Sequence, residues 1–164
     1  GLAYPPFADG DAIALAAEGG DYAAFSITTK GIAPLVLGGT APVLKRGEAV
    51  KLSWTAGSGS ITVKLDISHH GGSKGKVECQ TTDDGELEFS SALIGQLLDL
   101  GVAGYPTVIV TRKSTGSATI APGRVDFVIS SEVEQAVTVD GLVSCTEDSQ
   151  CASGQSCQSD LTCK

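Results

Sequence analysis

Hydrophobic and polar side chains alternate along two neighbouring segments in the first half of the chain. The first is Val50-Lys51-Leu52-Ser53-Trp54, and the second begins at Ile61 after a Gly/Ser-rich turn and runs to Ile67. Successive side chains of a strand point to opposite faces, so one face of each segment is apolar. The pattern predicts two neighbouring antiparallel strands with one buried face. The expected core residues on these strands are Trp54, Ile61, Val63, Leu65 and Ile67.

Other short segments of strand-like composition predict further strands. Strands are expected over residues 22–29, 107–112, 125–129 and 137–139, and a polar turn over residues 113–118. Pro34 interrupts the apolar residues 31–37, which favours an edge strand or a crossing between sheets, because proline cannot donate to a ladder. The sequence Asp83-Asp84-Gly85 is typical of a solvated hairpin turn.

Residues 90–101 change to helical spacing. Leu93, Leu97 and Leu100 recur on one helical face, a serine precedes them, and Gly101 follows as a left-handed stop. This segment predicts a helix of two or three turns, weakened by Gly95. It is the single helix that the pattern supports.

Seven to nine short strands separated by turn signals predict an all-β protein, an antiparallel β-sandwich with a barrel as the alternative. The 21 glycines and 6 prolines agree with many tight turns. The length of 164 residues fits one such domain with a small appendage. We therefore expect a sandwich domain over residues 1–141 and a cysteine-rich module over residues 142–164.

Four of the five cysteines recur at every sixth position near the end of the chain: Cys145, Cys151, Cys157 and Cys163. A segment this short lacks a core and needs cross-links, so two disulfides and an oxidising compartment are expected: periplasm, cell surface or outside the cell. Zinc is the competing interpretation, but the close two-to-four-residue ligand spacing of structural zinc sites is missing. Three pairings remain open from the residues alone. Cys79 is left over as a buried free thiol, a partner for a tail cysteine, or a surface thiol that joins two chains.

The net charge of −8 is concentrated in the last quarter of the chain. Residues up to 124 carry 12 acidic and 10 basic side chains, whereas later residues carry 7 acidic side chains and only one basic residue, Lys164. Such an end repels phosphate, which argues against nucleic acid and anionic lipid as partners. No apolar run approaches the roughly 20 residues of a membrane span. The absence of methionine indicates a processed or excised chain, and an anchor preceding Gly1 stays open.

The two histidines, His69 and His70, form with Gly71-Gly72 the most unusual local sequence. Adjacent histidines on a strand point to opposite faces, so they share a metal only if the glycines re-aim one of them. With Asp83, Asp84 or Cys79 they form a hypothetical site for one divalent metal ion at the sheet rim. The alternative, which the alternation favours, is a purely structural role without a cofactor.

Hydrolysis, calcium binding and carbohydrate binding each rest on fewer sequence features. Ser68, a neighbouring histidine and Asp66 contain the residue types of a hydrolytic triad, but no Gly-x-Ser-x-Gly elbow occurs. Asp83-Asp84-Gly85 lacks the ligand spacing of a calcium loop. Carbohydrate binding by aromatic stacking would depend on the scattered Tyr4, Tyr22 and Tyr105.

The order of elements resembles immunoglobulin-like domains of bacterial surface proteins. The shared features are a strand ending in Trp54, a cysteine strand, the Asp83-Asp84-Gly85 turn, a leucine helix and the strand Val108-Ile109-Val110-Thr111-Arg112. The last 21 residues resemble small cysteine-rich modules at the ends of secreted and lipoprotein chains of gliding soil bacteria. The resemblance implies an immunoglobulin-like or jelly-roll sandwich and an interleaved pairing, Cys145–Cys157 with Cys151–Cys163.

These observations predict a non-enzymatic, extracytoplasmic module that serves structure, adhesion or assembly at a bacterial cell surface, through a protein partner or through self-association. The alternative is a metal- or carbohydrate-binding module that uses the rim between His69 and Asp84.

Overall fold

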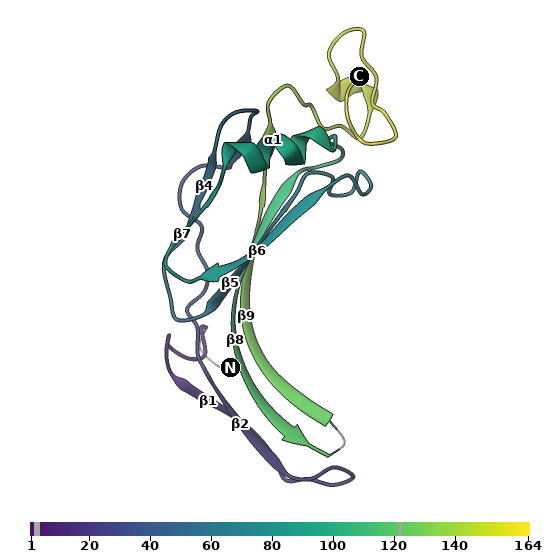
Figure 1. Cartoon of the computed structure of the whole chain (residues 1–164). Coiled ribbons are helices and arrows are strands. Elements are labelled where there is room, and N and C mark those ends of the chain that lie inside the picture. The colour runs from purple at the N-terminus through teal and green to yellow at the C-terminus, as the bar shows by residue number, and fades with distance from the viewer. Residues whose placement is uncertain (2–3, 122) are drawn as a thin grey trace.

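The computed structural model of the chain describes residues 1, 4–121 and 123–164, and its main feature is a four-stranded antiparallel sheet (Figure 1). The strand order is β6-β5-β8-β9. Two of these strands are short, β5 (Ser60–Asp66) and β6 (Lys76–Thr82), and two are long, β8 (Thr107–Ile120) and β9 (Gly123–Ala136). The protein is therefore all-β, as the sequence predicts.

Smaller elements make up the rest of the fold. Antiparallel pairs are formed by β1 (Ala12–Ala17) with β2 (Phe25–Lys30) and by β4 (Val50–Ser53) with β7 (Glu86–Phe89). A short parallel pair joins β3 (Val43–Leu44) to β10 (Thr138–Val139). The helix α1 spans Ser91–Asp99, and a 3-10 turn, η1, spans Asp148–Gln150 in the tail. Within the described ranges, neither helix has the length and apolar character needed to cross a bilayer.

The core lies between the four-stranded sheet and the layer that contains β4, β7 and α1. All five expected core residues are buried, with Trp54 6% exposed and Ile61, Val63 and Ile67 fully covered. The inward side chains of β5 meet those of β4 and the helix residues Ile94, Leu97 and Leu98. Alternation thus identified the buried face of these strands correctly.

The predicted pairing of the two opening strands is wrong. Strand β4, which ends just before Trp54, pairs with β7, whereas β5 pairs with β6 and β8. The connection over residues 54–59 therefore carries the chain from one layer to the other. Asp83-Asp84-Gly85 also connects the layers, from β6 to β7, and does not form a hairpin. Alternation reveals a buried face but not which strand lies beside it.

The polar turn predicted at residues 113–118 is also wrong, because these residues belong to β8. They pair with β9 without a break from Thr107–Ala136 to Ile120–Gly123. Beyond Lys113, the last β8 residue opposite β5, the two strands continue as a curved arm (Figure 1). The β1–β2 pair packs on this arm, and a Cβ on Gly116 would lie 2.5 Å from the carbonyl oxygen of Thr28. Only one face of the arm is covered. Its strands can therefore carry many serine and threonine residues, because the other face is exposed to solvent.

The helix agrees with its sequence signals. Ser90 is the N-cap, and its Oγ accepts a hydrogen bond from the Leu93 amide at 3.3 Å. Gly101 follows with a φ of +86°, a left-handed conformation that glycine adopts at little cost. Residues 31–36 between β2 and the Leu37–Trp54 bridge have no regular structure, so the segment broken by Pro34 is a crossing.

Candidate functional site

A buried ion pair between Arg112 and Asp83 lies near the middle of the protein. Arg112 Nε donates to Asp83 Oδ2 at 2.7 Å, and Arg112 Nη2 donates to Asp83 Oδ1 at 3.0 Å. The remaining donors of Arg112 bind the carbonyl oxygens of Ala33, at 3.0 Å, and Thr55. One arginine therefore ties β8, the layer connections and the 31–36 crossing together.

Trp54 and two glycines complete this cluster. Trp54 Nε1 donates to Asp83 Oδ1 at 2.9 Å, and the Gly59 amide donates to Oδ2 at 3.1 Å. A Cβ on Gly57 would lie 2.9 Å from Arg112 Cζ, and one on Gly59 would lie 2.7 Å from Arg112 Cγ. The Gly57-Ser58-Gly59 sequence leaves room for the guanidinium group, which explains the two glycines in the connection.

Hydrogen-bond donors stabilise the negative charge of the Asp83 carboxylate. Burial alone raises the pKa of this carboxyl group, but the hydrogen bonds from Arg112, the Gly59 amide and Trp54 act in the opposite direction and hold its pKa below the ordinary value. Asp83 is thus an ionised structural carboxylate whose two oxygens already accept four hydrogen bonds.

The hypothetical metal rim is not assembled. His69 and His70 follow β5, whereas Asp83 and Asp84 follow β6, and these strands are antiparallel. The two groups therefore lie at opposite ends of a seven-residue strand pair, about 20 Å apart. Asp84 accepts a hydrogen bond from Thr82 Oγ1 at 2.9 Å and, unlike Asp83, is exposed.

The histidine turn packs against the connection between α1 and β8. The two imidazole rings lie 3.9 Å apart, and His69 Nε2 is 3.6 Å from Glu134 Oε1 on β9. His70 has a φ of +63°, and a Cβ on Gly71 would lie 2.2 Å from the Gly104 amide. This close backbone approach requires glycine at position 71, so Gly71 has a packing explanation.

Cys79 is a half-buried free thiol on β6, opposite Val63 of β5. It partly packs against the core and is not joined to a tail cysteine. The tyrosines considered for carbohydrate binding do not gather: Tyr22 lies at the tip of the β1–β2 hairpin, Tyr4 precedes β1, and the Tyr105 amide donates to the His69 carbonyl.

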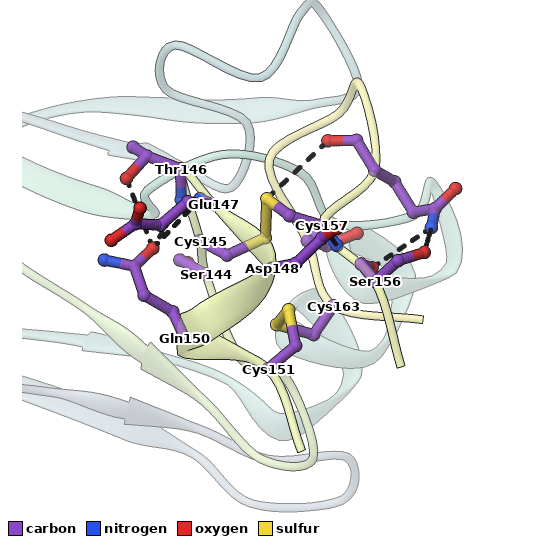
Figure 2. The surroundings of a disulfide bond; sticks show 12 residues. Ser144, Cys145, Thr146, Glu147, Asp148, Gln150, Cys151, Ser156, Cys157 and Cys163 are labelled. Carbon is purple, nitrogen blue, oxygen red and sulfur yellow. Dashed lines mark hydrogen bonds between the residues drawn. A yellow bond between two sulfur atoms is a disulfide. The ribbon is translucent and has the colours of Figure 1, made fainter. Parts of the chain in front are cut away.

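The tail carries two interleaved disulfides, Cys145–Cys157 and Cys151–Cys163, the pairing that the resemblance implies (Figure 2). Side chains reinforce them: Gln150 Oε1 accepts from the Thr146 amide at 2.6 Å, and Asp148 Oδ1 accepts from the Cys157 amide at 2.7 Å. In the described part of the chain, three of these cysteines form the only cluster of metal-ligand residue types, and their sulfurs are consumed in disulfides.

The tail also docks on the sandwich. The Gly104 amide donates to the Asp160 carbonyl at 2.7 Å, and Ser144 Oγ donates to the Gly104 carbonyl at 2.5 Å. Cys145 and Thr162 are fully buried. Gly104 thus contacts both the histidine turn and the cysteine-rich module.

A groove of about 610 Å³ lies where the tail, α1 and the β3–β10 pair meet. Apolar residues including Leu44, Leu98 and Val139 line it, with charged groups at its rim. The rim cations are largely paired: Lys164 lies 2.6 Å from Asp160, Lys45 lies 2.6 Å from Glu48, and Arg46 contacts Asp99. The groove is therefore a poor candidate for an anion site.

Strand β9 forms one edge of the four-stranded sheet. The Val137 amide donates to the Pro106 carbonyl on the β8 side, and the Thr138 amide donates to the Pro42 carbonyl on the other side. Backbone groups alternate between the two sides of a strand, and the β8–β9 register has no bulge, so every second residue of β9 directs its N–H and C=O away from β8. These residues are Arg124, Asp126, Val128, Ser130, Glu132, Glu134 and Ala136.

No backbone group of the described residues bonds to this edge, and β9 is the last strand of its sheet. Native proteins protect edge strands by shortness, proline, bulges or charged side chains, lysine above all, and β9 has charged side chains at Arg124, Asp126, Glu132 and Glu134. Over its 14 residues β9 contains neither proline nor lysine. It presents an exposed Val128 on one face and half-buried Phe127 and Ile129 on the other. Such an edge can accept a further strand.

Comparisons with protein-family models, with curated proteins and with solved structures find no match to this chain. Two features went unrecognised in the sequence. Arg112 lies at the end of an apolar strand segment, and a charged residue there indicates a buried carboxylate partner. Which carboxylate it is depends on the order of the strands in the sheet, which the sequence does not reveal. The edge of β9 depends on strand order in the same way.

Proposed function

We propose that this protein is a non-enzymatic, extracytoplasmic assembly module of a bacterial cell-surface protein, with an immunoglobulin-like sandwich that joins other chains by strand addition. The observation that carries the proposal is the free edge of β9, with seven outward N–H and seven outward C=O groups. An added strand satisfies these groups and extends the sheet. Adhesion and attachment through a lipoprotein anchor are narrower roles within this proposal.

The two disulfides support an oxidising location, because such bonds are typical of secreted, periplasmic and surface proteins. Two cross-links within the last 20 residues make the tail itself resistant to unfolding, and the tail contacts the rest of the protein at Gly104. Resistance of this kind suits a module that stays outside the cell.

The proposal that the protein is not an enzyme is supported by the hydrogen bonds that the candidate catalytic side chains already make. The buried carboxylate, Asp83, is saturated by Arg112, Trp54 and Gly59, which leaves it without a free oxygen for a substrate or metal. Ser68 Oγ donates to Asp66 and accepts from the Lys74 amide, within the turn after β5. These contacts stabilise turns and layer connections.

Strand addition can be tested with a synthetic peptide that has the sequence of residues 124–134. Amide exchange of the full chain is followed by NMR while the peptide is added. We expect slower exchange at outward amides such as Val128 and Ser130, because these N–H groups gain acceptors.

The matched control is the same peptide with every backbone amide N-methylated, so that neither of its edges can donate to a ladder. This peptide should leave the exchange of the outward amides unchanged. If the unmodified peptide has no effect at millimolar concentration, or both peptides act equally, strand addition at this edge is refuted.

A further inference from the structure

We propose that the strand added to β9 is β9 of a second copy, in an antiparallel pair centred on Val128. This inference rests on the proposed function and specifies the partner. The sheet β6-β5-β8-β9 would then continue into its symmetric copy as one eight-stranded sheet.

The backbone restricts the register. Outward-directed residues of one strand must oppose outward-directed residues of the other, and these are the even-numbered positions from Arg124 to Ala136. A two-fold axis further requires each pair to occur twice with exchanged roles. Only a small set of symmetric registers meets both conditions.

Charge selects among these registers. With Val128 opposite Val128 of the second copy, Arg124 opposes Glu132 and Asp126 opposes Ser130. Arg124 and Glu132 lie four residues on either side of Val128, so each dimer contains two such opposite-charge pairs. A pair centred on Ile129 would place Arg124 opposite Glu134 but also Asp126 opposite Glu132, and a pair centred on Ser130 would place Asp126 opposite Glu134 and leave Arg124 opposite Ala136. Like charges directly opposite each other destabilise a strand pair.

The two faces of β9 also fit this register. On the outer face, Val128 is 48% exposed and would be covered by its own copy. On the inner face, half-buried Phe127 would oppose Ile129 of the second copy. Cross-strand aromatic and β-branched pairs of this kind stabilise a sheet. A self-complementary arrangement of charge and apolar groups about one residue favours a second copy over an unrelated strand.

A charge-reversal cycle tests the pairing. We expect Arg124→Glu and Glu132→Arg each to raise the dimer dissociation constant at least about tenfold, measured by sedimentation equilibrium at about 0.1 M salt, where the screening length is about 10 Å. The double variant should return to within about threefold of the original value. The two residues lie about 26 Å apart within one chain, well beyond the screening length, so a rescue can arise only between copies.

Cysteine cross-linking tests the register in variants that keep all charges. In a Cys79→Ala background, Val128→Cys should form a dimer disulfide on mild oxidation, because opposed residues in this register lie about 5.5 Å apart at Cα. Ser130→Cys is the matched control on the same face. In this register the two copies of position 130 are offset by about 13 Å, so it should remain unlinked.

The outcomes separate the inference from the proposed function. A chain that stays monomeric at millimolar concentration, or dimers that cross-link through Ser130→Cys and not Val128→Cys, would overturn this pairing. If the β9 peptide still slows exchange at the outward amides in those cases, assembly by strand addition survives with a different partner. Absence of both effects removes both proposals.

Discussion

Arg112 and Asp83 form a two-pronged ion pair in which the exposed fractions of the side chains are 0% and 2%. The pair bridges β8 and the connection from β6 to β7, so it joins the two layers of the fold. Every guanidinium nitrogen has an acceptor, and both carboxylate oxygens accept from Trp54 or Gly59 as well. The layers are thus held in a fixed relation by one polar cluster inside an apolar core.

Removing one member of this pair should be costly. We expect Arg112→Met to lower the free energy of unfolding by about 3–5 kcal/mol, because Asp83 would be left as an uncompensated buried charge. The double variant Arg112→Met with Asp83→Asn should lose less than Arg112→Met alone, since no charge is stranded. Urea denaturation measures both, and equal or greater loss in the double variant would refute this role for the pair.

Low pH should lower the folding stability through protonation of Asp83. Its folded-state pKa is lower than its unfolded value, so its contribution is fully present above the unfolded pKa of about 4 and is lost as the pH falls through the folded-state pKa. We expect stability to fall from about pH 4 downward, and Asp83→Asn to reduce this fall.

The acid measurement is best made at about 1 M salt. The pKa values of Asp126 and Asp160 are also lowered, first by hydrogen bonds from Ser117 and Lys164 respectively, but both groups are more exposed than Asp83, and salt screens the attraction of Arg124 and Lys164 that contributes to their shifts. If Asp83→Asn and the unmodified chain show the same pH dependence, Asp83 does not carry the effect.

Strand faces were predictable from the sequence, but strand neighbours were not. Alternation from Ile61 to Ile67 predicted burial because it is a local property of β5. Which strands flank β5, and that residues 113–118 extend β8, depend on long-range pairing that no local pattern contains. The candidate metal rim failed for the same reason, since antiparallel β5 and β6 place the histidines and aspartates at opposite ends.

Reduction of the two tail disulfides should unfold the tail and leave the rest of the fold almost unchanged. Each disulfide is expected to stabilise the tail by about 2–4 kcal/mol through restriction of its unfolded state. Reduction should therefore unfold residues after Ser144 and speed amide exchange at Gly104, whose N–H donates to Asp160, while the melting of the sandwich changes little. Differential scanning calorimetry with exchange measurements checks this, and a large drop in the sandwich transition would show that the tail is integral to it.

Metal binding at the histidines provides a test of the alternative function. We expect the purified chain, after dialysis against zinc or copper, to hold less than one equivalent of either metal by elemental analysis. His69 has Glu134 nearby, but Asp83 and Asp84 are too distant to complete a ligand set. Stoichiometric metal that disappears in the His69→Ala, His70→Ala double variant would contradict the structural role of this turn.

The central claim, that β9 accepts a second β9 at its free edge, is tested most directly by amide exchange at several protein concentrations. Exchange at the outward amides of Asp126, Val128 and Ser130 should slow as the concentration rises, while Phe127 and Ile129, bonded to β8, should be protected throughout. Outward amides that exchange at the same unprotected rate at every concentration would contradict the account.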